Sequence, residues 1–121
     1  MQHIALAHAE TREHGGLPGL RDDALLESAL ARPRNLHAYE DVSDIFALAA
    51  CYCVALAKNH PFNDGNKRIA FIASLTFLLL HGWRVVADQG AAAAIVLDVA
   101  AGATGQDGYA AWLRDHAQSR S

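Results

Sequence analysis

The chain has 121 residues, of which 52% are hydrophobic and 19% charged, and a formal net charge of −3. This length and composition argue against a disordered chain and fit one compact domain over residues 1–121. Basic residues form no cluster or stripe, so the sequence disfavours direct nucleic-acid binding. The longest apolar runs, Ile45–Ala57 and Ile69–Leu80, fall short of the roughly 18 residues of a membrane span.

Helix signals dominate the first third of the chain. The first helix is predicted over Gln2–Glu13, because two glycines and a proline follow it. The second begins at Asp22 or Asp23, where an acidic cap precedes an apolar pattern, and is expected to end before Pro33. Residues 33–41 are then predicted to form a connecting loop or flap.

Two strongly apolar helices follow, the third from near Ser43 to about Asn59 and the fourth from near Asp64 to His81. Because both are apolar nearly all round, we expect other helices to enclose them. The remaining predicted elements are a short extended piece at 83–86, a fifth helix at 88–100 and a sixth at 106–118. The sequence therefore predicts an all-α bundle of about six helices around two central ones.

Cys51 and Cys53 are the two cysteines of the chain. Two positions apart on a helix, their side chains point to different faces, so neither a disulfide nor a shared metal site fits. We expect two buried free thiols, which is consistent with a reducing, cytoplasmic environment.

The turn between the two central helices is unusually polar. One interpretation is a solvated turn, since Pro61 and the segment 63–65 are good turn formers. The other is a functional site, because a helix N-terminus that carries Gly65 offers backbone N–H groups to an anion. Lys67 and Arg68 oppose the helix dipole there, a placement that an anionic ligand would explain. The polar residues are His60, Asn63, Asp64, Asn66, Lys67 and Arg68.

The segment His60–Arg68, HPFNDGNKR, resembles the Fic/Doc signature HxFx[D/E][G/A]N[G/K]R at every defined position. The resemblance extends to residues 15–22 and 25–30 and reaches 82–86, and the length is similar to that of Doc (death-on-curing) toxins. It implies the Fic/Doc helical fold and group transfer from ATP.

The resemblance also implies a role for each residue of the motif. His60 would accept the proton of a target hydroxyl, and Arg68 would neutralise charge on the transferred group. Asp64 would hold Mg²⁺. The residues implied to bind the nucleotide phosphates are Asn63, Gly65, Asn66, Lys67 and Arg68.

Two positions bear on which group is transferred. AMP-transferring Fic proteins resemble HPFxxGNGRxxR, whereas this chain has Lys67 in place of the glycine and Phe71 in place of the second arginine. Both departures match Doc, in which the γ-phosphoryl group of ATP moves to a protein hydroxyl. Pro61 and Gly65 instead follow the Fic pattern, so AMP transfer stays an alternative to the favoured phosphoryl transfer.

The resemblance implies partners as well. The inhibitory pattern [S/T]xxxE[G/N] of many Fic proteins is not found, so restraint is expected from a Phd-like antitoxin, and the implied target is elongation factor Tu. The target is expected to dock near residues 33–41. A non-catalytic helical binding module is the alternative from another class, and the sequence does not decide the oligomeric state.

Overall fold

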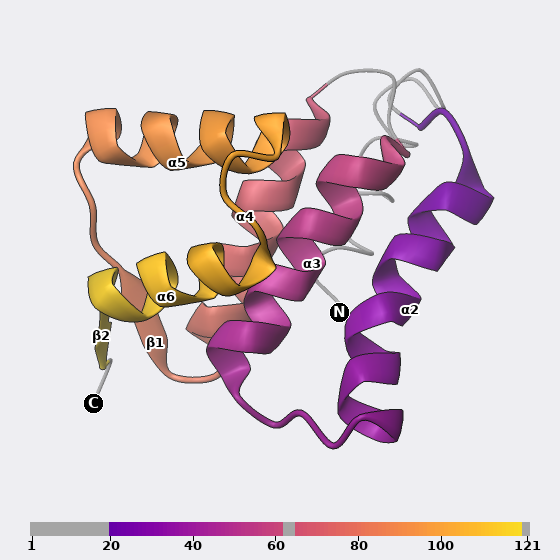
Figure 1. Ribbon diagram of the computed structural model, residues 1–121, viewed down its shortest axis with the longest axis horizontal. Coiled ribbons are helices and arrows are strands. Elements are labelled where there is room, and N and C mark those ends of the chain that lie inside the picture. Colours follow the sequence, from indigo (N-terminus) through magenta and orange to yellow (C-terminus); the bar gives the residue numbers. More distant parts are fainter. Residues whose placement is uncertain (1–19, 62–64, 120–121) are drawn as a thin grey trace.

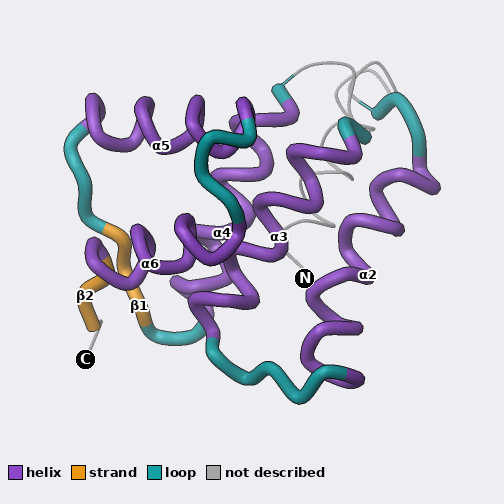
Figure 2. The backbone as a smooth tube through the Cα atoms, viewed as in Figure 1, coloured by secondary structure: helices purple, strands orange, loops and turns teal. Residues whose placement is uncertain are grey.

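The computed structural model describes residues 20–61 and 65–119 of the chain. The helix predicted over Gln2–Glu13 lies outside these residues. Within them, helices pack around α3 and a two-stranded sheet sits at one corner (Figures 1 and 2). The elements in chain order are α2 (Asp23–Tyr39), α3 (Ile45–Asn59), α4 (Asn66–Leu80), β1 (Trp83–Val85), α5 (Gln89–Ala101), α6 (Gln106–His116) and β2 (Ala117–Ser119).

Three of the helices begin at an aspartate whose carboxylate accepts backbone N–H bonds of the first turn. Asp22 accepts from Ala24 and Leu25 at the start of α2, at 2.9 and 3.2 Å. Asp44 caps α3 and Asp88 caps α5 in the same way. Of the two candidates for the first cap, Asp22 and Asp23, the structure selects Asp22, and the cap predicted at Asp88 is confirmed. Such a side chain accepts from N–H groups that have no partner within the helix.

The prediction that the second helix ends before Pro33 is wrong, because α2 continues to Tyr39 with Pro33 inside it. Proline cannot donate to the carbonyl four residues earlier, which usually ends a helix. Here the apolar spacing continues from Leu26 and Ala29 through Pro33 to Leu36, and the ring of Pro33 is fully buried. Burial against the core outweighs the lost hydrogen bond.

Helix α3 is the centre of the bundle, as its apolar sequence predicts. Every residue from Leu48 to Leu56 is buried, and α2, α4, α5 and α6 all contact it. Helix α4 is less enclosed than expected, since Ile72 and Leu80 are about half exposed. It buries one face only, through residues that include Ala70 and Ala73. Small side chains there allow α4 to lie close to α3.

The short extended piece predicted at 83–86 is confirmed as β1, which pairs antiparallel with β2. The sixth helix was expected to reach Gln118 but ends at His116, because the next three residues pair with β1, Trp83 opposite Ser119 and Val85 opposite Ala117. The N–H of Val86 also donates to the carbonyl of His116, at 2.9 Å. This pairing joins the C-terminal residues to the chain that follows α4.

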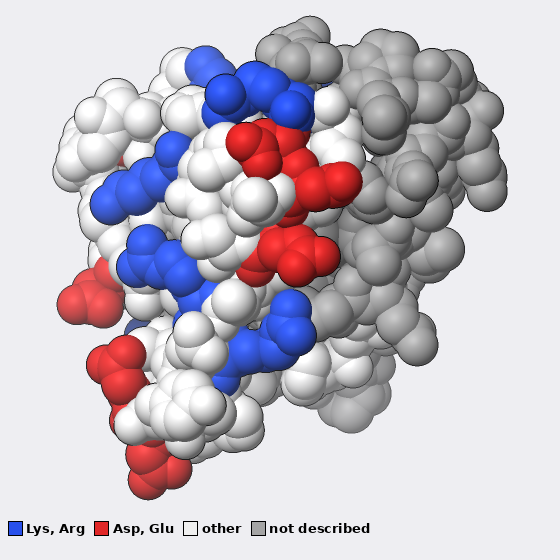
Figure 3. All heavy atoms as spheres, turned by 90° about the vertical axis from the view of Figure 1, so that its right-hand side faces the viewer, with Lys and Arg blue, Asp and Glu red and all other residues white. Residues whose placement is uncertain are grey.

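The surface agrees with the charge pattern of the sequence. On the face shown in Figure 3, acidic and basic side chains lie interspersed rather than in a patch of one sign. Both cysteines are buried and free, as predicted. None of the helices in the described part of the chain is long and apolar enough to cross a membrane.

Candidate active site

The end of α3 forms one edge of the candidate site. Its C-cap is His60, whose backbone is left-handed with φ 48° and ψ 54° and whose N–H donates to the carbonyl of Leu56. Few residues other than glycine adopt this conformation, although histidine is among those that tolerate it. His60 is exposed, while Pro61 directly after it is fully buried. The chain therefore turns sharply at the histidine and leaves the imidazole on the surface.

The beginning of α4 forms the facing edge. Its N-cap, Gly65, is left-handed with φ 74° and accepts the N–H of Ile69 at 2.8 Å. A Cβ added at Gly65 would meet no atom of residues 20–61 or 65–119 within 4 Å. This turn carries the positive end of the helix dipole, which favours an anion.

A cleft of about 770 Å³ joins these two helix ends to α5. His60 and the first turn of α4 contribute its polar wall, which includes Lys67 and Arg68. No carboxylate is among the described residues that line it. The electrostatic character of this lining is therefore positive, which suits a phosphorylated ligand.

Helix α5 supplies the opposite, apolar wall of the cleft. Its contribution consists of small and aliphatic side chains: Ala92, Ala93, Val96, Leu97 and Ala100. Leu97 is 58% exposed, although α5 is one of the most apolar helices in the chain. A cleft with one cationic and one apolar wall fits a ligand that has both phosphates and a hydrophobic part.

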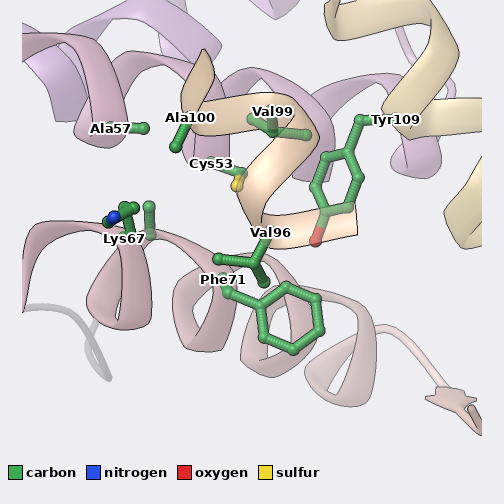
Figure 4. A pocket seen from close by; sticks show the side chains of 9 residues that line it. Cys53, Ala57, Lys67, Phe71, Val96, Val99, Ala100 and Tyr109 are labelled. Carbon is green, nitrogen blue, oxygen red and sulfur yellow. The ribbon is translucent and has the colours of Figure 1, made fainter. Parts of the chain in front are cut away.

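Side chains of α3, α4, α5 and α6 meet beside the cleft, among them Cys53, Phe71, Val96 and Tyr109 (Figure 4). Phe71 on α4 packs with Tyr109 and Trp112 of α6, at ring-centroid distances of 6.5 and 6.4 Å. Cys53 on α3 is buried beside them, and burial raises the pKa of its thiol to about 12. Burial likewise raises the pKa of Tyr109. These groups therefore stay protonated near neutral pH and act as packing and hydrogen-bonding groups.

Most of the predicted site residues meet at this cleft. These residues lie at the end of α3 and at the beginning of α4, and the two helix ends place them on one wall of the cleft. Asn63 and Asp64, with Phe62, lie outside the described residues. In the ranges 20–61 and 65–119 no group of three or more His, Cys, Asp or Glu side chains is placed so that it could hold a metal ion, and the Mg²⁺ ligand predicted at Asp64 stays a prediction. The predicted residues that line the cleft are His60, Gly65, Asn66, Lys67 and Arg68.

The segment 33–41 does not form the predicted flap, because most of it belongs to α2. The link that follows, at 40–44, joins the start of α3, whereas His60 lies at its other end. A 15-residue helix is about 22 Å long. The 40–44 link is therefore separated from the cleft by the length of α3.

Sequence reasoning missed two parts of the site. The α5 wall was predicted as a helix but not as part of the cleft, because only the fold places it opposite α4. Arg21, which contacts the backbone of His60, was not singled out either. An arginine 39 residues away in the sequence gives no local signal of that contact.

Comparison with known proteins identifies relatives of this chain. A family model described as the Fic/DOC family matches residues 1–78. The chain is 43% identical over 82 residues to "Protein kinase doc" of Escherichia phage P1, which covers 68% of this chain and 65% of that protein. It is 39% identical over 75 residues to "Toxin Doc" of Mycolicibacterium smegmatis, with 61% and 58% covered. The chain thus spans less than two thirds of the length of either relative.

Proposed function

The chain belongs to the Fic/DOC family, and we propose that it is a Doc-like toxin that transfers the γ-phosphoryl group of ATP to a hydroxyl of a target protein. Two relatives carry the names of a toxin and a protein kinase, which supports a protein-modifying transferase. The observation that carries the proposal is the cleft in which His60, Lys67 and Arg68 share one wall with the N-terminus of α4.

The charges of this wall support a triphosphate as the ligand. Cations at a helix N-terminus are unfavourable for the helix alone, since the dipole is positive there. A bound triphosphate reverses that balance, because it interacts favourably with both Lys67 and Arg68 and with the dipole. The planar guanidinium of Arg68 also suits two-point contact with phosphate oxygens.

The packing of Phe71 supports transfer of the γ-phosphoryl group rather than of AMP. This position carries the second arginine in the AMP-transferring motif. Here the ring is half-buried against Tyr109 and Trp112, so α4 presents no second cation at that point. The cleft instead has Lys67 in the first turn, where AMP-transferring proteins have glycine.

We assign the chemical steps to the chain's own residues. His60 accepts the proton of the target hydroxyl as its oxygen attacks the γ-phosphorus. The bond from the γ-phosphorus to the bridging oxygen breaks, and ADP leaves with the electron pair. Arg68 and Lys67 neutralise the charge that develops on the phosphates. Mg²⁺, for which Asp64 is the proposed ligand, would supply further neutralisation when bound.

The biological setting belongs to the same proposal. A toxin of this kind acts in the cytoplasm on elongation factor Tu and blocks translation, and a Phd-like antitoxin restrains it. The relative named "Toxin Doc" supports the toxin role, and the antitoxin is part of this proposal.

The test measures which labelled phosphate of ATP is transferred to the target protein. Purified chain is incubated with Mg²⁺, elongation factor Tu and ATP labelled at either the γ- or the α-phosphate. We expect label on the target protein only from γ-labelled ATP. Label from α-labelled ATP would instead establish AMP transfer, and no label from either would contradict the proposed activity on this target.

A histidine variant provides the control. His60→Asn removes the base but keeps a side chain that tolerates the left-handed backbone, so label transfer should disappear while the fold persists. His81→Asn replaces another exposed histidine, at the end of α4 opposite the cleft, and should keep full activity. Transfer by His60→Asn at the wild-type rate would show that His60 is not the base.

A further inference from the structure

The side chain of Arg21 contacts the backbone at the end of α3. Its Nε donates to the carbonyl oxygen of His60 at 2.9 Å, and its Nη2 donates to the same oxygen at 2.7 Å. Nη2 also donates to the carbonyl of Asn59 at 3.3 Å. The guanidinium thus donates two N–H groups to one carbonyl oxygen, and that carbonyl belongs to the residue assigned as the base.

Further hydrogen bonds join the same two segments. The backbone N–H groups of Arg21 and Asp22 donate to the carbonyl of Pro61, at 2.7 and 3.0 Å. Asn59 returns a bond, since its Nδ2 donates to the carbonyl of Leu25 at 2.9 Å. Residues at the start of α2 therefore form hydrogen bonds with three consecutive residues: Asn59, His60 and Pro61.

Two physical reasons make these contacts relevant to the imidazole. The carbonyls at the end of a helix carry the negative end of its dipole, so a guanidinium there is favourable. His60 also has a left-handed backbone, which side chains with a Cβ adopt only when the surroundings impose it. Arg21 is exposed, so its side chain does not serve as core packing.

We propose that Arg21 is a positioning residue, which fixes the left-handed turn at His60 and so directs its imidazole toward the cleft. The inference rests on the proposed function, in which His60 is the base. Lysine at position 21 cannot replace this pair of hydrogen bonds, because an ammonium is a point charge and lacks the planar, two-pronged donor geometry of a guanidinium.

The kinetic test compares Arg21→Ala and Arg21→Lys with Arg84→Ala. Arg84 is an exposed arginine on β1, outside the cleft and outside the segment 33–41 where the target is expected to dock, so its removal is the control. Arg21→Ala should lower kcat by about 10- to 100-fold, the loss expected when a catalytic group is misplaced. The KM for ATP should change little, because Arg21 is not among the cleft residues.

Rescue separates positioning from general destabilisation. Arg21→Lys should regain only a part of kcat, and millimolar guanidinium, too dilute to denature, should raise the kcat of Arg21→Ala but not of Arg84→Ala. Equal kcat for wild type and Arg21→Ala would overturn the proposal, as would a loss that guanidinium leaves unchanged or one that follows the unfolded fraction measured by circular dichroism.

A spectroscopic readout keeps the proposal distinct from the proposed function. The NMR Cα and Cβ shifts of His60 report its backbone conformation and require no activity. They should move away from left-handed values in Arg21→Ala and stay unchanged in Arg84→Ala. If the wild type transfers no label, the proposed function fails, yet these shifts still decide whether Arg21 sets the turn; unchanged shifts in Arg21→Ala would refute it.

Discussion

The hydroxyl of Tyr109 on α6 lies 2.7 Å from the hydroxyl of Ser74 on α4, and both side chains are fully buried. Ser74 donates its one proton to the carbonyl of Phe71, at 2.7 Å, so Tyr109 is the donor to Ser74. Cys53 of α3 is buried beside Tyr109. The buried hydrogen bond between Ser74 and Tyr109 ties α4 and α6 together behind the wall that carries the candidate site.

Removing one partner of the Ser74–Tyr109 hydrogen bond should lower the free energy of unfolding. Ser74→Ala leaves the buried Tyr109 hydroxyl without that acceptor, so we expect a loss of about 1–3 kcal/mol in the free energy of unfolding. Tyr109→Phe should cost about 1 kcal/mol, because Ser74 keeps its bond to Phe71. Urea denaturation measures both. The double variant should lose less than the sum of the two, and strict additivity would show that the pair does not interact.

The thiol of Cys53 should be inert in the folded protein. Burial raises its pKa from 9.0 to about 12, so very little thiolate, the reactive form, exists at pH 8. Burial also raises the pKa of the Cys51 thiol. A chromogenic disulfide reagent should therefore react with neither in native protein and with both after denaturation. Rapid reaction of native Cys53→Ala would identify Cys51 as accessible and contradict the burial seen here.

The same raised pKa values predict a loss of stability at alkaline pH. A group with a folded pKa above its unfolded value stabilises the fold fully below the unfolded pKa and ceases to do so as pH rises. For Cys53 this window runs from 9.0 to about 12, and for Tyr52, which is also buried, from 10.0 to about 12. The free energy of unfolding should fall by about 1.4 kcal/mol per pH unit for each such group.

Thermal or urea denaturation between pH 8 and 11 measures this slope. Cys53→Ala should show a flatter dependence above pH 9 than the wild type, whatever its stability at neutral pH. Equal slopes for the two proteins would mean that the Cys53 thiol does not titrate with unfolding in this range.

Gly65 should be sensitive to substitution through its backbone alone. Its φ of 74° strains any side chain with a Cβ, although a Cβ there meets no atom of the described residues within 4 Å. We expect Gly65→Ala to lower the free energy of unfolding by about 1–2 kcal/mol, and Gly65→Asn by less, because asparagine tolerates left-handed backbone. Gly105→Ala is the control, since Gly105 also precedes a helix in open space but has a φ of −84°. A loss at Gly105 equal to that at Gly65 would argue against conformational strain.

Local patterns predicted most of the described fold. Aspartate caps at Asp22 and Asp88 and the apolar run in α3 identified helices correctly, because caps and burial patterns act within a few residues. The prediction failed where distant contacts decide. Pro33 stays helical because its ring is buried in the core, and β2 exists because it pairs with β1, more than 30 residues earlier.

In the candidate site, too, local patterns predicted one part and distant contacts determine the other. The polar turn from His60 to Arg68 was identified from sequence, and its described residues line one wall of a cleft. The α5 wall and the contact from Arg21 depend on helix packing across the bundle, which no local pattern encodes. The roles predicted for Asn63 and Asp64 stay predictions, because these residues lie outside the described part of the chain.

Lys67 should govern which phosphate of ATP is transferred, if the proposed reaction is correct. It lies in the cleft wall, in the first turn of α4, where a long cationic side chain occupies space that a glycine would leave open. Lys67→Gly should therefore lower transfer of γ-label and make transfer of α-label detectable. The fold should tolerate the change, because Lys67 is exposed and glycine in a helix costs about 1 kcal/mol.

Lys67→Gln separates the charge from the space that the side chain fills. It removes the cation but keeps the chain, so it should weaken γ-transfer without opening the path to α-transfer. Phe71→Arg is less suitable, because it breaks the ring contacts with Tyr109 and Trp112. Label ratios from α- and γ-labelled ATP measure each outcome. A ratio in Lys67→Gly that equals the wild type would show that the direction of transfer is set elsewhere in the cleft.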